Sequence, residues 1–127
     1  MTHTPDPDQT IFHLAMPDDW AAAFRSAEYT MSTRGRTLDE EGFIHASTHE
    51  QLEATANRFY ADVDQLVVLS IDPRKVPHEI RWERPAPGVD ELFPHIYGPL
   101  PIAAVVRNDF WIHTIDTTGA GWSLDAL

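Results

Sequence analysis

The sequence contains no cysteine, and this absence excludes several kinds of site. Disulfides, cysteine nucleophiles, zinc sites with thiolate ligands and iron–sulfur clusters all require that side chain. No apolar run approaches the roughly 18–20 residues that a membrane-spanning helix needs, and the polar first ten residues lack the apolar core of a secretory signal. We therefore expect a cytoplasmic protein that does not act on a membrane.

Basic side chains are also scarce. Nine Lys and Arg stand against twenty Asp and Glu, so the formal net charge at pH 7 is −11. A surface this acidic repels the phosphate backbone, so we expect no nucleic-acid partner. The hydrophobic fraction of 43% is typical of a folded domain. A chain of this length can bury about two-thirds of its unfolded surface without a disulfide or a metal.

Short elements of both kinds follow one another along the chain. A proline that fits a first helical turn predicts a helix from Pro17, and a capping-box pattern predicts a second helix over about 48–60. Residues 30–40 and 92–101 are interpreted as loops, the second because it carries three prolines and a glycine. Apolar runs and alternating patterns predict strands at 10–15, 42–46, 66–71, 78–84 and 106–113.

This mixture of short strands and helices lacks regular βα alternation, which favours an α+β fold over a doubly wound sheet. Residues 10–115 are predicted to form a single domain. Residues 1–9 are interpreted as a flexible N-terminal tail and 116–127 as a C-terminal tail.

Three histidines lie in apolar or rigid segments: His13 in IFHL, His45 in FIHAS and His95 in FPHIYG. A histidine flanked by large apolar side chains is usually either hydrogen-bonded within a core or functional. Because side chains alternate along a strand, His45 and Ser47 should share one face. The same holds for His95 and Tyr97 if their segment is extended. The three segments predict a shared pocket, with a satisfied core histidine as the competing interpretation at each position.

Three more interpretations stay open at this point. Glu83, on a half-exposed strand, is either a general acid or base or a surface carboxylate. Arg58, on the second helix, either meets a phosphate or is solvated. Ser47 is also explained as the N-cap of the helix that follows it. The apolar segment 92–101 is a candidate dimer surface.

Other chemistries fit the sequence less well. Three imidazoles can bind zinc and leave one position for water, but no H-E-x-x-H occurs and the three histidine segments lie far apart in the sequence. There is no G-x-S-x-G, no phosphate-binding P-loop and no G-x-G-x-x-G. We predict no metal ligands, although a metal-dependent hydrolase stays as an alternative.

Six separate runs occur in the order of one known family: IFHLA (11–15), EGFIHAST (41–48), NRF (57–59), LVVL (66–69), RWE (81–83) and FPHIYGPL (93–100). Through these runs the chain resembles the small bacterial family DUF 952, over about residues 10–110. That family carries no established activity. The resemblance therefore implies more about the fold than about the function.

The family is similar to the ADP-ribosyltransferase-like superfamily. The resemblance thus implies small antiparallel split sheets with two main helices around a cleft that holds NAD. It also implies that His13 contacts the ligand from the first strand, and that His45 and Ser47 line the second strand near the nicotinamide pocket. His95 and Tyr97 would lie at the third position, where typical transferases have a glutamate.

From these observations we expect a transferase-like enzyme that acts on NAD or a related nucleotide. The expected acid–base groups are His45, His95 and Glu83, and the expected ligand-binding groups are His13, Ser47, Tyr97 and Arg58. One alternative is a non-catalytic module that binds a nucleotide or another metabolite. The other is the metal-dependent hydrolase with histidine ligands.

Overall fold

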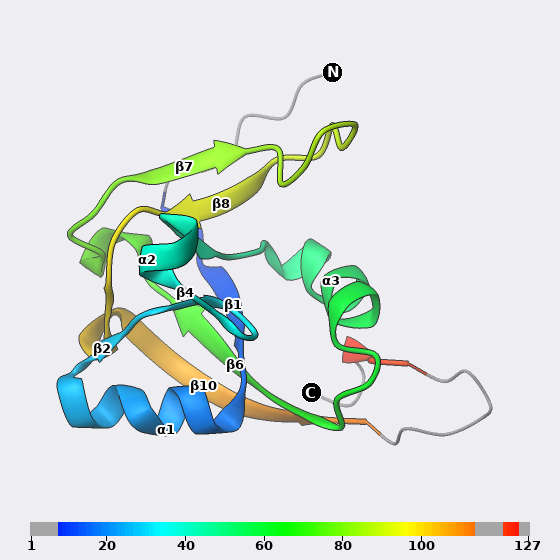
Figure 1. The fold of residues 1–127 in the computed structure, drawn as a ribbon, viewed down its shortest axis with the longest axis horizontal. Coiled ribbons are helices and arrows are strands. Elements are labelled where there is room, and N and C mark those ends of the chain that lie inside the picture. Colours follow the sequence, from blue (N-terminus) through cyan, green and yellow to red (C-terminus); the bar gives the residue numbers. More distant parts are fainter. Residues whose placement is uncertain (1–7, 114–120, 125–127) are drawn as a thin grey trace.

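The structure is a computed structural model, and it describes residues 8–113 and 121–124 (Figure 1). Most of the two predicted tails lies outside these residues. The helices that it describes are α1 (Pro17–Ser26), α2 (Leu38–Glu41) and α3 (Leu52–Phe59), with short 3-10 turns η1 (His49–Gln51), η2 (Pro73–Lys75) and η3 (Ile102–Ala104). The strands that it describes are β1 (Ile11–Ala15), β2 (Glu28–Tyr29), β3 (Met31–Thr33), β4 (Arg36–Thr37), β5 (Ile44–His45), β6 (Gln65–Ile71), β7 (Ile80–Glu83), β8 (Phe93–Ile96), β9 (Leu100–Pro101) and β10 (Val105–Ile112).

The longest strands form an antiparallel sheet in the order β1-β6-β10. The central strand β6 is the apolar run that the sequence marks most clearly, and six of its seven residues are buried. Val67 and Leu69 pack into one core cluster, whereas Leu66 and Val68 pack into a second cluster on the other face. Because β6 is buried on both faces, its sequence is continuously apolar rather than alternating.

A second antiparallel sheet has the order β5-β8-β7, and it corrects the prediction of a loop at 92–101. β8 is its central strand although it contains Pro94. The Ala46 N–H donates to the Pro94 carbonyl, 3.0 Å away, but proline has no N–H to return the bond. β5 ends at His45, one residue before this one-way bond, so Pro94 shortens the pairing of β5 with β8 without interrupting β8. Most of β8 is buried, so residues 93–96 are not an exposed loop, and a dimer surface in the segment 92–101 stays a prediction.

The predicted loop at 30–40 also contains regular structure. β3 and β4 pair as a hairpin, and α2 follows directly. The hairpin turns at Gly35, whose φ of 74° is a conformation that glycine adopts without strain. A capping box starts α2, because the Thr37 side chain accepts from the Glu40 N–H while the Glu40 carboxylate accepts from the Thr37 N–H. The second predicted helix also has a capping box, at Thr48, but it begins as a 3-10 turn.

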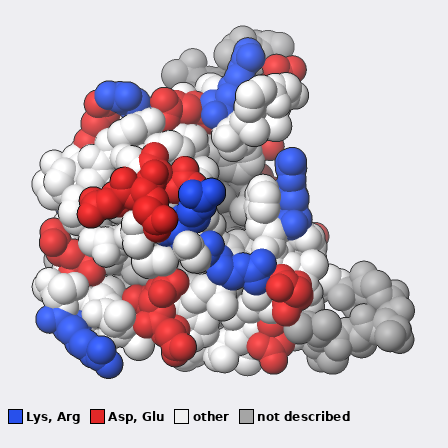
Figure 2. Space-filling view, viewed as in Figure 1, with Lys and Arg blue, Asp and Glu red and all other residues white. Residues whose placement is uncertain are grey.

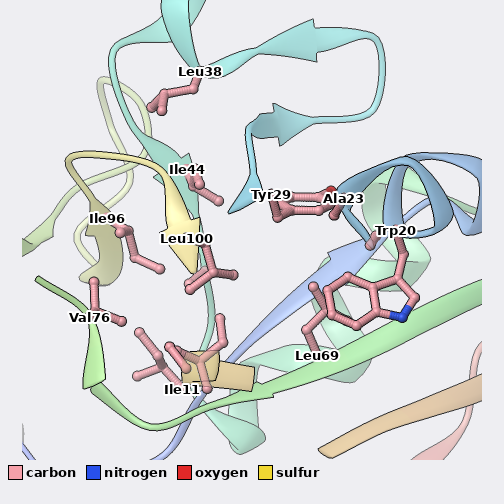
Figure 3. Close-up of a cluster of buried hydrophobic side chains, with 14 of the residues drawn as sticks. Ile11, Trp20, Ala23, Tyr29, Leu38, Ile44, Leu69, Val76, Ile96 and Leu100 are labelled. Carbon is pink, nitrogen blue, oxygen red and sulfur yellow. The ribbon is translucent and has the colours of Figure 1, made fainter. Parts of the chain in front are cut away.

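The first core cluster fills the space between the two sheets and α1 (Figure 3). Trp20 and Ala23 of α1 point into it, and Ile44 and Ile96 enter it from the inner face of the β5-β8-β7 sheet. Both isoleucines are fully buried. The second sheet therefore has one face committed to the core, and its other face is available for polar side chains.

The second core cluster lies under α3. It includes Trp122, which comes from the segment expected to be a C-terminal tail. Asn57 of α3 holds this tryptophan's backbone by two bonds: its side-chain N–H group donates to the Trp122 carbonyl, and its oxygen accepts from the Trp122 N–H. Residues 121–124 therefore lie beside α3 (Figure 1).

The acidic side chains are not spread evenly over the surface. Figure 2 shows a group of acidic side chains over α2, and its first turn supplies Asp39, Glu40 and Glu41. None of the helices described is long and apolar enough to cross a membrane. The architecture confirms a mixed α and β fold with several small antiparallel sheets and few helices.

Candidate functional site

A pocket of about 470 Å³ lies between α3, the adjoining ends of β1 and β5, and the loop that joins β7 to β8. Its volume falls in the range of small-molecule sites. The strand ends are held together because Phe12 and Ser47 exchange two backbone hydrogen bonds, of 2.8 and 2.7 Å. Its lining residues include Phe12, His13, His45, Ser47, Glu50, Gln51, Thr55, Arg58, Phe59, Glu91 and Phe93.

His45 and Ser47 both line this pocket, and so does Ala46 between them, because β5 ends at His45 and Ser47 forms an isolated bridge with Phe12. The ring nitrogens of His45 form no hydrogen bond with another residue that the structure describes. Ser47 does not act as the helix N-cap, because the capping box belongs to Thr48 and Gln51. The polar atoms of both side chains are therefore available to a ligand.

The pocket carries charges of both signs at its edge. Arg58 is exposed and lines the pocket, and it forms no ion pair with any carboxylate in the described part of the chain. Its guanidinium carbon lies 5.2 Å from the centre of the neighbouring Phe59 ring. Glu50 and Glu91 also line the pocket. Such an edge suits a ligand that has both an anionic and a cationic group.

His13 lies in the pocket wall but is bound on both sides. Its Nδ1–H donates to the His45 carbonyl, 2.5 Å away, and its Nε2 accepts from the Tyr29 hydroxyl at 2.8 Å. Because a carbonyl only accepts, this arrangement fixes the tautomer. Complete burial lowers the pKa of His13 to about 4, so its ring is neutral at pH 7. His13 thus fixes the backbone on which His45 sits.

Glu83, His95 and Tyr97 meet on the outer face of the β5-β8-β7 sheet. One carboxylate oxygen of Glu83 accepts from the His95 Nδ1–H at 2.9 Å and from the Tyr97 hydroxyl at 2.5 Å. These two bonds, with the Tyr97 bond the stronger influence, lower the pKa of Glu83, so it is ionised at pH 7. The same bond raises the pKa of Tyr97. Glu83 of β7, His95 of β8 and Tyr97, which directly follows β8, therefore form one charged network.

His45 joins this network to the pocket. In the sheet register it lies directly opposite His95, and the two ring centres are 5.1 Å apart. The Nε2 atom of His95 is buried and has no partner among the described residues. Burial, followed by the nearby His95, lowers the pKa of His45, so this ring is also neutral at pH 7 and able to accept a proton.

Aromatic and cationic groups hold the network in place. The Phe43 ring stacks on His95 with centres 4.1 Å apart, and its edge meets His45 at 4.8 Å. The guanidinium carbon of Arg81 lies 4.4 Å from the centre of the Tyr97 ring. Gly42, whose φ is 90°, ends α2 and turns the chain toward Phe43.

The seven predicted site residues fall into two adjoining groups. His13, His45, Ser47 and Arg58 line the pocket, whereas Glu83, His95 and Tyr97 lie beside it. Sequence reasoning missed Tyr29, Phe43 and Arg81. The available signal was spacing: Phe43 lies two positions from His45, and Arg81 lies two positions from Glu83. Residues two apart in an extended segment share one face.

A metal centre is not favoured by this arrangement. Within residues 8–113 and 121–124, no group of three or more His, Asp or Glu side chains is placed to hold a metal ion. His13 has both ring nitrogens engaged by protein groups, which leaves neither for a metal.

A comparison with known protein families gives a match over most of the chain. The family described as "Protein of unknown function (DUF952)" matches residues 14–108, about three-quarters of the chain. The chain belongs to the DUF952 family. The match contains both groups of site residues except His13, which precedes it by one position. No curated protein matches the sequence.

The fold of this DUF952 member is similar to solved structures of a bacterial protein. Two crystal structures of protein CC0527 from Caulobacter crescentus, one of them a double mutant, are 25% identical to the chain with a TM-score of 0.75. Each match covers 92% of this chain and 96% of that one. A solution NMR structure of CC0527 is 27% identical, with a TM-score of 0.66, and covers 81% and 84% of the two chains.

Proposed function

We propose that this DUF952 protein is a transferase-like enzyme that binds NAD or a related nucleotide between α3 and the outer face of the β5-β8-β7 sheet. The observation that carries the proposal is the placement of His45. It is the histidine that lines the pocket with ring nitrogens unbonded to other described residues, and it adjoins the Glu83–His95–Tyr97 network.

The three histidines have different capacities for acid–base chemistry. His13 is neutral and has both nitrogens occupied, so it is a positioning residue. His95 donates one N–H to Glu83, and its other nitrogen is buried. His45 remains as the general base, because it is neutral at pH 7 and faces the ligand.

The edge of the pocket indicates the chemical class of the ligand. The unpaired Arg58 guanidinium suits a phosphate, and Glu50 and Glu91 suit a positive group on the same molecule. NAD has both features, since its pyrophosphate is anionic and its nicotinamide ring is cationic. Phe12 and Phe93 add apolar walls for a planar ring. These features support the similarity to ADP-ribosyltransferases that the sequence implies.

The proposed reaction moves the ADP-ribosyl group from nicotinamide to an oxygen nucleophile. The bond from the ribose anomeric carbon to the nicotinamide nitrogen breaks, and its electron pair stays on nicotinamide, which leaves as a neutral molecule. A bond forms from the same carbon to a hydroxyl or water oxygen. His45 takes the proton of that oxygen and passes it to solvent. In this proposal Glu83 of β7 takes the place of the glutamate that typical transferases have. It acts through His95 and Tyr97, which donate hydrogen bonds to its carboxylate.

Thermal unfolding with NAD, ADP-ribose and nicotinamide tests the binding step. A ligand at about 100 times its dissociation constant stabilises the folded state by about 2.7 kcal/mol, which raises the midpoint of a domain this size by several degrees. We expect Arg58→Gln to reduce the shift with ADP-ribose but not with nicotinamide. Arg25→Gln is the matched control, because Arg25 is exposed on α1 and does not line the pocket. No shift with any of the three compounds contradicts the proposal.

Release of nicotinamide, measured by chromatography, tests the chemical step. We expect His45→Gln to keep the ADP-ribose shift and to lower release by about 10²–10⁴-fold. The control is His49→Gln, since His49 is exposed and lies outside the pocket lining. A shift with ADP-ribose but no release from the unmodified protein would instead support the non-catalytic binding module.

A further inference from the structure

The strand β10 forms one edge of the β1-β6-β10 sheet, and apolar side chains on it face solvent. Val106, Phe110 and Ile112 are 53%, 62% and 59% exposed. Among the residues that the structure describes, β10 pairs only with β6. An edge strand of eight residues with exposed apolar side chains is a template for pairing with another chain.

One hydrogen bond shows which residues of β10 direct their backbone N–H and C=O groups toward β6 and which direct them toward the free edge. The His113 N–H donates to the Asp64 carbonyl, 3.1 Å away, on the β6 side. Consecutive residues of an antiparallel strand direct their N–H and C=O groups to alternate sides. Asn108, Phe110 and Ile112 therefore direct theirs away from β6, toward the free edge.

The sheet register shows that the exposed ring of Phe110 continues a core face. Phe110 lies opposite Val67, and Asn108 lies opposite Leu69. Val67 and Leu69 belong to the first core cluster together with Trp20 of α1, and Figure 3 shows Trp20 beside Leu69. The ring of Phe110 thus extends that apolar face beyond the part that α1 covers.

We propose that a second copy of this chain pairs with β10 in antiparallel orientation, about a two-fold axis at Asn108. This register places Arg107 opposite the partner's Asp109, and it brings Val106, which lies at an irregularity in the β10 register, near the partner's Phe110. Opposite charges that face each other across strands are favourable, and so are apolar pairs that contain an aromatic ring. Within one chain Arg107 already contacts Asp109 at 2.8 Å, so the pair of strands gathers two positive and two negative groups.

Neighbouring two-fold registers are less favourable. Moving the axis to residue 109 places Asp109 opposite the partner's Asp109, and moving it to residue 107 places Arg107 opposite the partner's Arg107. Like charges that face each other across strands are destabilising. Among these three registers the charge pattern favours the one at Asn108, in which the two sheets join into one continuous sheet in the order β1-β6-β10-β10-β6-β1.

Light scattering on the full chain, over a range of micromolar concentrations, tests this pairing. We expect twice the chain mass of 14.4 kDa, and we expect both Asp109→Arg and Arg107→Asp to give the single-chain mass. The double variant that carries both changes restores opposite charges and should recover the dimer, which also shows that the single variants did not simply fail to fold. Glu79→Arg is the matched control, since Glu79 and Arg81 form a similar exposed pair elsewhere.

Two results overturn the proposal. The first is a single-chain mass for the unmodified protein at all concentrations. The second is a dimer that persists in both single charge reversals, because it must then use another surface. Neither result bears on the pocket, so a failure here leaves the proposed function to its own test.

Discussion

The two faces of the β5-β8-β7 sheet differ although they belong to the same short strands. The inner face presents Ile44 and Ile96 to a close-packed core, and both are fully buried. The outer face presents His45, His95 and Tyr97, which meet Glu83 and a pocket. The inner face should therefore determine stability, and the outer face should determine binding and chemistry.

The largest effect should follow from a cavity on the inner face. We expect Ile96→Ala to lower the free energy of unfolding by about 3 kcal/mol, because the isoleucine is completely buried and its neighbours relax only in part. Urea unfolding measures this loss. Leu92→Ala is the control, because Leu92 is 38% exposed and its truncation should cost much less. Similar losses for both variants would contradict the assignment of the inner face to the core.

The second effect concerns His13, which connects the core to the site. Its pKa is about 4 when folded and 6.5 in an unfolded chain, so the unfolded state takes up a proton first as the pH falls. Its contribution to stability is complete above pH 6.5 and decreases as the pH falls toward 4. Because one pKa unit corresponds to 1.36 kcal/mol, the total decrease is roughly 3 kcal/mol.

Urea unfolding across this pH range measures that contribution. We expect the stability of His13→Gln to depend less on pH between 6.5 and 4 than that of the unmodified chain. His49→Gln, at an exposed position, should keep the original dependence. If the pH dependence of His13→Gln equals that of the unmodified chain, His13 is not held neutral by burial.

The regular elements could be predicted from sequence where local pattern decides them. The apolar run of β6 and the proline at the start of α1 both led to correct elements. The segments 30–40 and 92–101 were misjudged, because their turn and proline residues were given more weight than pairing. Pro94 is accommodated at the end of the β5 ladder, and this position depends on a partner strand that the sequence does not reveal.

The candidate site could be predicted in its residues but not in its arrangement. All three histidine segments were identified, yet their roles depend on contacts from distant strands. Tyr29 occupies one nitrogen of His13 across 16 positions, and Glu83 reaches His95 across 12. Such contacts follow from the order of strands in a sheet, which local periodicity does not determine.

The smallest effect should be confined to the outer face. We expect Glu83→Gln to leave the fold intact and to lower the pKa of the Tyr97 hydroxyl, because an ionised carboxylate no longer accepts its proton. Ultraviolet titration of the three tyrosines measures this change. The Tyr97→Phe variant identifies which titration step belongs to Tyr97. An unchanged Tyr97 step in Glu83→Gln would show that the two groups are not hydrogen-bonded.

The most direct test of the account is an NMR titration of the histidine ring nitrogens with and without ADP-ribose. We predict that the ligand moves the His45 signals and raises the pKa of this histidine, since its ring lines the pocket and the ligand brings negative charge. The signals of His13 should keep the tautomer protonated at Nδ1 from neutral pH down to about 5. Signals of His45 that do not respond to ADP-ribose, together with a His13 that titrates normally, would contradict the central claim.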